Sequence, residues 1–504
     1  MGAPEIWKST EPLLRWNGWT SWTIGHSFEH AFALGRTGSA KSSTLIHFAS
    51  KAVLRAGYGC LFQTTKKSDT ATYLKWINEA GRSDSLVMID TLRGLGSNLI
   101  KQELDYGADH SGKIEEEATE NVVRLFQFIT SLTGGTNNRR GETDIWDDAA
   151  KVLLRNALTL VYIATGTVSI DDLNEVVASS AESVIEAESP AWRRDKLCGQ
   201  FLDKAEKSHP DLNSVKLAGQ YFTKTFPRLA KETRTSVLFN YSSMWGDTLA
   251  RDPLRSLFFG KTDYTMDILL QGAVVLVNLP VDEKMEIGRV ANGLARWAAQ
   301  QAIQRRNDLT GNREAARPVA IIWDECQKTL CETDVSFQAT ARDRRCMVLG
   351  GTQTIGFMRA PVGKDLGEGF ASNCNTKVFY QNQDPDTNRF MSEVIGKITR
   401  FKTKSKTTDS KGHTTKTKEE EEEDAVPARM AQDLKTGGEE HDLKVTAILT
   451  RGGQNFLPIY GFGRRAMKLN YHQEAWGWNW FNFFTRNTAV CARPRPAPDF
   501  RHLR

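Results

Sequence analysis

One glycine-bounded loop near the start of the sequence constrains the fold of this chain more than any other feature. Residues 35–42 follow the P-loop pattern of Gly, four residues, then Gly-Lys-Ser/Thr, except that Ala40 replaces the second glycine. The apolar run 30–34 predicts a buried strand before the loop, and the pattern from Ser43 to Gly57 predicts a helix after it. Strand, glycine loop and helix are the context in which this motif binds phosphate.

In such a loop, backbone N–H groups surround the anion, Lys41 adds a positive charge, and the Ser42 hydroxyl can hold Mg²⁺. If position 40 needs a positive φ angle, alanine costs about 1 kcal/mol there. The sequence leaves open whether nucleotide binding is weakened, kept or abolished, and a glycine-rich turn that binds nothing is the alternative. The predicted nucleotide-binding residues are Gly35, Arg36, Thr37, Gly38, Ser39, Ala40, Lys41, Ser42 and Ser43.

A second segment supplies the acids that a P-loop needs from a partner strand. The apolar run 319–322 predicts a central parallel strand, with Asp324 and Glu325 near its carboxyl end, where open α/β sheets bind ligands. Asp324 is placed to hold Mg²⁺, directly or through water, and Glu325 to orient and deprotonate a water molecule. A strand that ends in a solvated acidic turn is the alternative.

A third apolar strand is predicted over 347–353 and ends in the polar amide of Gln353. Before it, Arg342, Arg344 and Arg345 offer guanidinium groups. A guanidinium that reaches across a subunit boundary can stabilise charge on a transferred phosphoryl group. A solvated helix end is the alternative for these arginines.

Five blocks occur in the order seen in the FtsK/HerA-type ATPases, and the chain resembles the TraG/TraD-like coupling proteins of conjugation and type IV secretion among them. The blocks are His30–Ser43, Gly272–Pro280, Trp323–Gln327, Arg342–Gln353, and Asn373–Val378 with Asp384, Thr387 and Gly396. Together they span about residues 18–465. The chain departs from the family at Ala40, and its second strand, 59–66, lacks the Asp that often precedes Lys-Gly, which we interpret as a peripheral feature.

The resemblance implies an α/β fold, a RecA-like P-loop NTPase with a mostly parallel central sheet and an inserted all-α domain. By position, it assigns Lys41 and Ser42 to phosphate and Mg²⁺, and Asp324 to Mg²⁺. It assigns Glu325 to water activation and Gln353 to sensing the γ-phosphate, from a strand between the acidic strand and the phosphate-binding strand. It assigns Arg342 as a trans-acting arginine finger, with Arg344 and Arg345 as fallbacks. The implied cofactors are ATP and Mg²⁺.

We expect four regions along the chain. They are 1–141, the first part of the nucleotide-binding domain; 142–250, the inserted all-α domain; 251–470, the second part, with a charged hairpin or loop at 400–425; and 471–504, an aromatic and basic tail. With 504 residues, 40% of them hydrophobic and 25% charged, the chain is long enough for two or three ordinary globular domains. Seven scattered cysteines, an odd number, argue against a disulfide framework.

Two segments allow several interpretations. The stretch 401–424 changes from Lys/Thr-rich to wholly acidic and predicts either a hairpin that reaches a DNA pore or a solvated insertion. Six aromatic residues crowd into 476–484. That tail can lie at a membrane surface, stack on single-stranded nucleic acid, dock on a partner or fold back on its own subunit.

We therefore expect an ATP-driven DNA translocase that delivers nucleoprotein to a type IV secretion or conjugation apparatus and works as a homo-oligomer, a hexamer. The net charge of +5 is consistent with a basic channel for DNA but does not require one. The alternatives are a HerA/FtsK-like DNA-processing translocase, a secretion ATPase acting on protein subunits, and a weakly or non-hydrolysing nucleotide-binding scaffold. No apolar run approaches the roughly 18 residues of a spanning helix, although coupling proteins usually begin with such helices. We expect a cytoplasmic protein that meets the inner membrane through partners or its tail.

Overall fold

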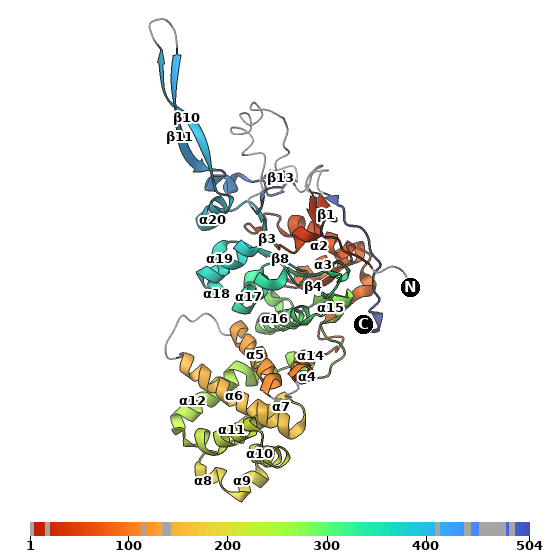
Figure 1. Cartoon of the computed structure of the whole chain (residues 1–504), viewed down its shortest axis with the longest axis vertical. Helices are drawn as coiled ribbons and strands as arrows, with labels where there is room; N and C mark the ends of the chain where they lie inside the picture. Colours follow the sequence, from red (N-terminus) through yellow and green to blue (C-terminus); the bar gives the residue numbers. More distant parts are fainter. Residues whose placement is uncertain are drawn as a thin grey trace.

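The computed structural model of this chain describes residues 5–15, 21–111, 116–133, 143–408, 414–437, 445–452, 480–482 and 489–503. Figure 1 shows a central sheet with flanking helices, a helical lobe below it, and one long hairpin that projects from the opposite end.

A mixed sheet forms the centre of the molecule. In the described residues it has nine strands in the order β13-β12-β9-β3-β8-β7-β4-β6-β5, and every pair from β9 to β5 is parallel. The strands are β3 (Ala31–Leu34), β4 (Gly59–Gln63), β5 (Leu86–Ile89), β6 (Val274–Val277), β7 (Val319–Trp323), β8 (Cys346–Thr352), β9 (Thr376–Phe379), and the antiparallel β12 (Thr446–Arg451) and β13 (Trp480–Asn482). The order confirms that the strand before Gln353 lies between the P-loop strand and the acidic strand.

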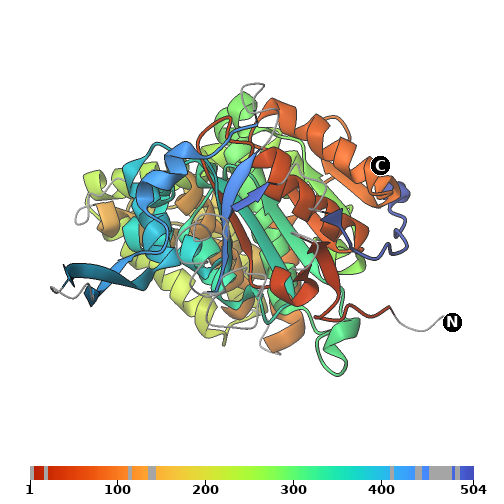
Figure 2. The ribbon, with the colours of Figure 1, turned by 90° about the horizontal axis from the view of Figure 1, so that it is seen from above.

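Helices cover both faces of this sheet, which explains why its strands are apolar at successive positions (Figure 2). Neighbouring side chains of one strand enter different cores: Ile321 packs in the core on the side of α16 (Val281–Arg305), and Ile322 in the core on the side of α2 (His47–Arg55). The other helices that follow the central strands are α3 (Lys67–Glu79), α17 (Glu332–Ala341), α18 (Ile355–Val362), α19 (Lys364–Asn373) and α20 (Pro385–Ile395).

The described residues between β5 and β6 contain no strand, and most of them form the helical lobe. Its core is continuous with the α16 face of the sheet. One of its helices begins at a capped position, where the Ser169 hydroxyl accepts a hydrogen bond from the Asp172 N–H at 3.0 Å. The boundary at residue 142 stays a prediction, since helical structure already begins at Leu99. The helices are α4 (Leu99–Ser111), α5 (Glu116–Thr133), α6 (Thr143–Thr165), α7 (Ile170–Ala178), α8 (Val184–Ala187), α9 (Pro190–Asp195), α10 (Leu197–Ser208), α11 (Asn213–Gln220), α12 (Lys231–Tyr241), α13 (Asp247–Ala250), α14 (Leu254–Phe258) and α15 (Ile268–Gln271).

The charged segment forms the predicted hairpin. Strands β10 (Lys397–Thr408) and β11 (Thr414–Asp424) pair antiparallel along their length and project from the sheet (Figure 1). Its tip, 409–413, lies outside the described residues. The two interpretations of this segment, a pore element and a solvated insertion, therefore both stay open.

Part of the C-terminal tail folds back on its own subunit. Strand β14 (Ala489–Val490) pairs with β1 (Pro12–Arg15), which also pairs with β2 (Ser21–Thr23). The buried Arg495 guanidinium contacts Glu5 at 3.0 Å and Glu11 at 2.8 Å. Most of the aromatic stretch 476–484 lies outside the described residues, so its role stays open.

None of the seven cysteines forms a disulfide bond in the described residues, in agreement with the argument against a disulfide framework. Within the described ranges, no single helix has the length and hydropathy to cross a membrane; one pair, Asp148–Thr165 with Ile170–Ala178, meets these criteria together but is bent by 118°.

Candidate nucleotide-binding site

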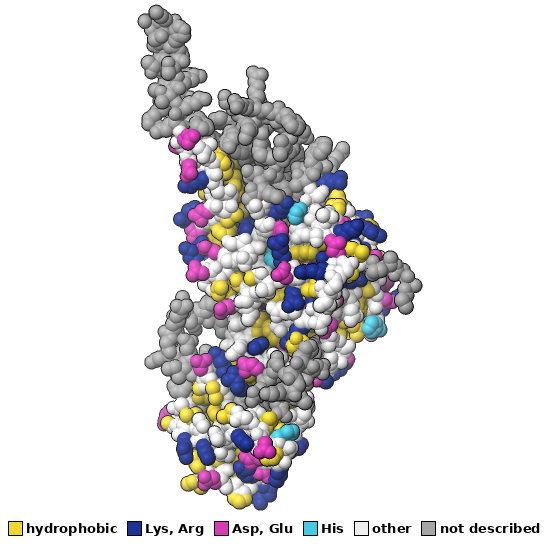
Figure 3. All heavy atoms as spheres, viewed as in Figure 1, with side chains coloured by type: hydrophobic (Ala, Val, Ile, Leu, Met, Phe, Trp, Pro, Cys, Tyr) yellow, Lys and Arg dark blue, Asp and Glu magenta, His cyan; other side chains and the backbone are white. Residues whose placement is uncertain are grey.

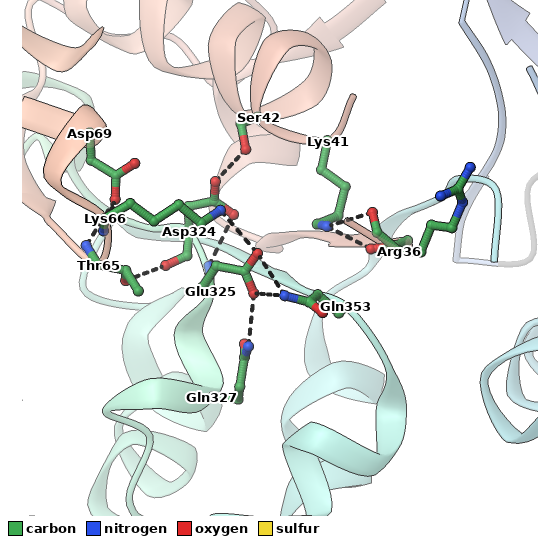
Figure 4. A network of polar contacts seen from close by, with 11 residues as sticks. Arg36, Lys41, Ser42, Thr65, Lys66, Asp69, Asp324, Glu325, Gln327 and Gln353 are labelled. Atoms are coloured by element: carbon green, nitrogen blue, oxygen red, sulfur yellow. Dashed lines mark hydrogen bonds and ion pairs between the residues drawn. The ribbon is translucent and has the colours of Figure 1, made fainter. Parts of the chain in front are cut away.

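The P-loop connects β3 to α2 at the carboxyl edge of the sheet, as the motif predicts. A Cβ on Gly35 would lie 2.6 Å from the Ser39 hydroxyl and from the Tyr380 side chain, so this position has no room for a larger residue. The Lys41 ammonium donates to the Gly35 carbonyl at 2.6 Å and to the Arg36 carbonyl at 3.3 Å (Figure 4). In this conformation the Lys41 ammonium is therefore bonded to carbonyl groups at the start of its own loop.

Ala40 has the left-handed backbone that its position in the motif suggests. Its φ is +70°, close to the +77° of Gly38. An alanine in this region costs about 1 kcal/mol relative to glycine, because its Cβ approaches the backbone. The loop still brings the Ser42 hydroxyl to the Asp324 carboxylate, so Ala40 strains the P-loop but does not remove it.

The acidic strand meets the P-loop across β8. The Ser42 hydroxyl donates a hydrogen bond to the Asp324 carboxylate, although 282 positions separate the two residues. A Cβ on Gly351 of β8 would come within 2.8 Å of that carboxylate, so glycine makes room for it. Thr65, just beyond β4, donates to the Asp324 carbonyl at 3.0 Å from the other side. Asp324 is therefore buried and held between the loop and the neighbouring strand.

Glu325 receives hydrogen bonds from three sides (Figure 4). Its backbone is left-handed, with φ of +52°, and its carboxylate is buried. The Gln327 amide donates at 2.8 Å, the Gln353 amide at 3.3 and 3.4 Å, and the Lys66 ammonium at 3.2 Å. The predicted sensor Gln353 thus contacts the predicted catalytic acid directly.

These surroundings set the charge of the site. Burial by itself would raise the pKa of Glu325, but the Gln327 amide and the ammonium groups of Lys41 and Lys66 outweigh it and hold the pKa below its usual value. Burial lowers the pKa of Lys41, against the opposing effect of Glu325 and Asp324. Glu325 is therefore an ionised carboxylate at neutral pH and can accept a proton.

The chemistry of the site fits both predicted cofactors. The Ser42 hydroxyl and the Asp324 carboxylate converge and are hard oxygen ligands of the kind that Mg²⁺ prefers. The loop backbone and Lys41 suit the phosphates of a nucleotide, and Glu325 lies beside them on the neighbouring acidic strand. With water at Glu325, this arrangement can support phosphoryl transfer to water.

A buried ion pair between Arg296 and Asp334, which sequence reasoning missed, packs against the end of the acidic strand. The Arg296 guanidinium contacts Asp334 at 2.7 Å and lies 3.9 Å from the ring centroid of Trp323, the residue before Asp324. It also donates to Gln63 at the end of β4. Arg296 therefore contacts the ends of two strands: β7, which presents the acids, and β4, which presents Lys66.

The candidate arginines lie at the other edge of the sheet. Arg342 follows α17 and precedes β8, whereas Glu325 follows the carboxyl end of the parallel strand β7. The length of β8, about 20 Å, separates these two edges. Arg342 is largely exposed and lies 3.6 Å from Glu29. Arg345 is buried and donates to the carbonyls of Trp7 and Ala316, so it does not suit the fallback role.

Sequence reasoning brought together the loop and the acids but missed two of the donors to Glu325. Lys66 was interpreted as part of a peripheral strand end, and Gln327 only as part of a motif. A usable signal existed for Lys66, because it follows the buried run 59–63 by three positions and parallel strands end at one edge. Nothing in the local sequence points to Arg296.

The fold and the site define a class. The chain has the fold of a RecA-like P-loop NTPase, with a mostly parallel sheet and a large all-α lobe.

Comparisons with known proteins make this class more specific. Residues 318–436 match the family model described as the TraM recognition site of TraD and TraG. A search of the curated proteins found no match to this sequence. The fold is similar to that of the bacterial conjugative coupling protein TrwBdeltaN70, with 15% identity, 88% of this chain and 86% of that chain covered, and a TM-score of 0.58.

It is also similar to the plasmid coupling protein TrwB in complex with ADP and Mg²⁺, with 15% identity, 86% and 84% coverage and a TM-score of 0.56. TrwB with a non-hydrolysable ATP analogue matches at 14% identity, 85% and 84% coverage and a TM-score of 0.56. Together with the family model, these matches confirm the predicted resemblance to TraG/TraD-like coupling proteins.

Proposed function

We propose that this protein is an ATP-hydrolysing coupling ATPase that moves DNA or nucleoprotein toward a conjugation or type IV secretion apparatus. One observation carries the enzymatic part: the hydrogen bond from Ser42 to Asp324, with Glu325 beside it and held by three donors. The match of residues 318–436 to a TraD and TraG family model supports the coupling role.

In the proposed reaction a water oxygen attacks the γ-phosphorus of ATP in line with the bond to the β,γ-bridging oxygen. That bond breaks, its electron pair leaves with ADP, and a proton of the water passes to the Glu325 carboxylate. The products are ADP and inorganic phosphate. Lys41 exchanges its loop carbonyls for phosphate oxygens, and Gln353 connects the reacting end of the nucleotide to Glu325. Ser42 and Asp324 would hold Mg²⁺, which when bound neutralises phosphate charge.

The proposed role of Arg342 requires an oligomer. Within one subunit, Arg342 and Glu325 lie at opposite edges of the sheet, so the guanidinium can reach only a neighbour's nucleotide. A ring of identical subunits gives every site such a neighbour. We propose a homo-oligomer, a hexamer by resemblance, with DNA in its channel.

The proposed partners are relaxosome and secretion components. The family model matched by residues 318–436 is described as a TraM recognition site. The hairpin β10–β11 projects from this segment and is accessible to a partner (Figure 1). On the face in Figure 3, Lys and Arg side chains are mixed with Asp and Glu, so a DNA path is better sought on surfaces that an oligomer would enclose. We propose a cytoplasmic location, with contact to the inner membrane through partners or the tail.

The test measures ATP turnover by the wild type and by Glu325→Gln, without DNA and with single- or double-stranded DNA, alongside the molecular mass in solution. We expect turnover that DNA stimulates, and a loss of about 100-fold or more in Glu325→Gln because the base is gone. Glu332→Gln, an exposed acid at the start of α17, is the matched control and should keep full activity.

Each other result has a distinct meaning. Turnover that ignores DNA favours an ATPase acting on protein subunits. Nucleotide binding without turnover favours a scaffold, a second candidate that the strained backbone of Ala40 supports. A protein that neither binds nor hydrolyses ATP would overturn the proposed function.

A further inference from the structure

Lys66 enters the site from the end of β4, where the sequence departs from the family pattern. Strand β4 pairs in parallel with β7, with Gln63 opposite Trp323. Three residues past Gln63 and two past Trp323, the chain presents Lys66 and Glu325 at the same edge of the sheet. Their ammonium and carboxylate groups lie 3.2 Å apart (Figure 4).

The backbone that carries Lys66 is held firmly. The N–H groups of Thr65 and Lys66 both donate to the Asp69 carboxylate, at 2.9 and 2.7 Å, at the start of α3. Thr65 also binds the carbonyl of Asp324 through its hydroxyl. The lysine therefore starts from a fixed point beside the acidic strand, and its pairing with Glu325 does not depend on a loose loop.

Lys66 differs from the other groups around Glu325. The amides of Gln327 and Gln353 are neutral, and the Lys41 ammonium lies 2.6 Å from a loop carbonyl. Among the described residues, Lys66 is the cation within ion-pair distance of the Glu325 carboxylate. If Lys41 turns to nucleotide phosphates, as proposed above, Lys66 is the cation that stays with Glu325.

We propose that Lys66 is a positioning residue that holds the Glu325 carboxylate in the orientation needed for attack by water. This inference rests on the proposed hydrolysis. It also implies that the strand end we considered peripheral belongs to the catalytic machinery.

The experiment compares kcat and KM of ATP turnover in the wild type, Lys66→Gln, Lys66→Arg and Lys67→Gln. The matched control, Lys67, is the next residue, largely exposed and 3.8 Å from Glu283. We expect kcat of Lys66→Gln to fall by about two- to fivefold while KM for ATP stays unchanged, because Lys66 orients the base and does not bind the nucleotide. Lys66→Arg should restore kcat, and Lys67→Gln should follow the wild type.

A second measurement does not depend on turnover. Urea unfolding of the wild type, Lys66→Gln, Glu325→Gln and the double variant forms a double-mutant cycle. Non-additive midpoints confirm the pair, and additive midpoints overturn it. An unchanged kcat in Lys66→Gln, with the wild type active, overturns the role of Lys66 alone. A wild type without any turnover overturns the proposed function, and with it the catalytic role of Lys66.

Discussion

At the scale of single residues, the site depends on side chains that lie where the backbone is unusual. Glu325 and Ala40 both have positive φ angles without being glycine. Strain of this kind is costly and occurs mostly at functional sites, where surrounding contacts hold it in place. For Glu325, those contacts are its three hydrogen-bond donors and a buried strand end. For Ala40, the P-loop pattern names the residue that would relieve the strain, which is glycine.

Ala40→Gly should stabilise the protein. Glycine removes a left-handed cost of about 1 kcal/mol, although some of the gain is lost to the greater freedom of glycine in the unfolded chain. We expect a higher urea midpoint, and tighter binding of ADP if the strained loop resists phosphate.

The matched control for that change is Gly38→Ala, at φ of +77° in the same loop. It should lower stability by about 1 kcal/mol. A lower midpoint for Ala40→Gly would contradict the strain argument. Higher stability without a gain in DNA-dependent turnover would show that Ala40 does not limit hydrolysis.

At the scale of elements, buried polar groups connect the ends of two strands, β4 and β7, to helices α16 and α17. Arg296 on α16 contacts Asp334 on α17, and both side chains are 1% exposed. Asp334 also accepts hydrogen bonds from the Gln300 amide at 2.8 Å and the Cys331 N–H at 2.9 Å. The pair therefore connects two helices to the strand that carries the acids.

Asp334→Asn should destabilise the protein by about 3–5 kcal/mol, because it leaves the Arg296 charge buried and unpaired. Asp105→Asn is the comparison. It breaks the exposed pair with Lys101, at 2.6 Å, and should cost less than about 1 kcal/mol. Urea unfolding measures both values. Equal losses in the two variants would mean that the buried pair does not support the strand ends.

At the scale of the whole molecule, the two lobes share one hydrophobic core. Residues of the sheet, of α16 and of the helical lobe belong to the same cluster. Helices α5 and α16 approach so closely at Gly293 that a Cβ there would lie 2.2 Å from a methyl group of Leu132. A shift at the nucleotide site can therefore reach the helical lobe through packed side chains, without a hinge of open chain.

Arg342 provides a prediction about the assembly. If it acts across a subunit boundary, Arg342→Ala and Glu325→Gln should each be inactive alone, because the first lacks the finger and the second lacks the base. Mixed oligomers of the two should regain part of the activity, since some boundaries join an intact finger to an intact site. ATP turnover after co-assembly measures this rescue. Mixtures that stay inactive while the subunits exchange would contradict the trans role.

The sequence by itself determined the nucleotide loop, the acidic strand, the strand before Gln353 and the all-helical stretch, because each follows from a local pattern of apolar and turn residues. The resemblance added their order in the sheet. It also led us to interpret Lys66 as peripheral and gave no sign of the ion pair between Arg296 and Asp334.

Only the tertiary structure decided which side chains meet at the carboxyl edge of the sheet. Ser42 and Asp324 are 282 positions apart, and Lys66 and Glu325 are 259 apart. Such pairs are set by strand order and parallel register, which are long-range properties of the folded chain. The same register sends Arg342 to the opposite edge. A local pattern can predict a strand, but only its neighbours fix where the residue at its end will lie.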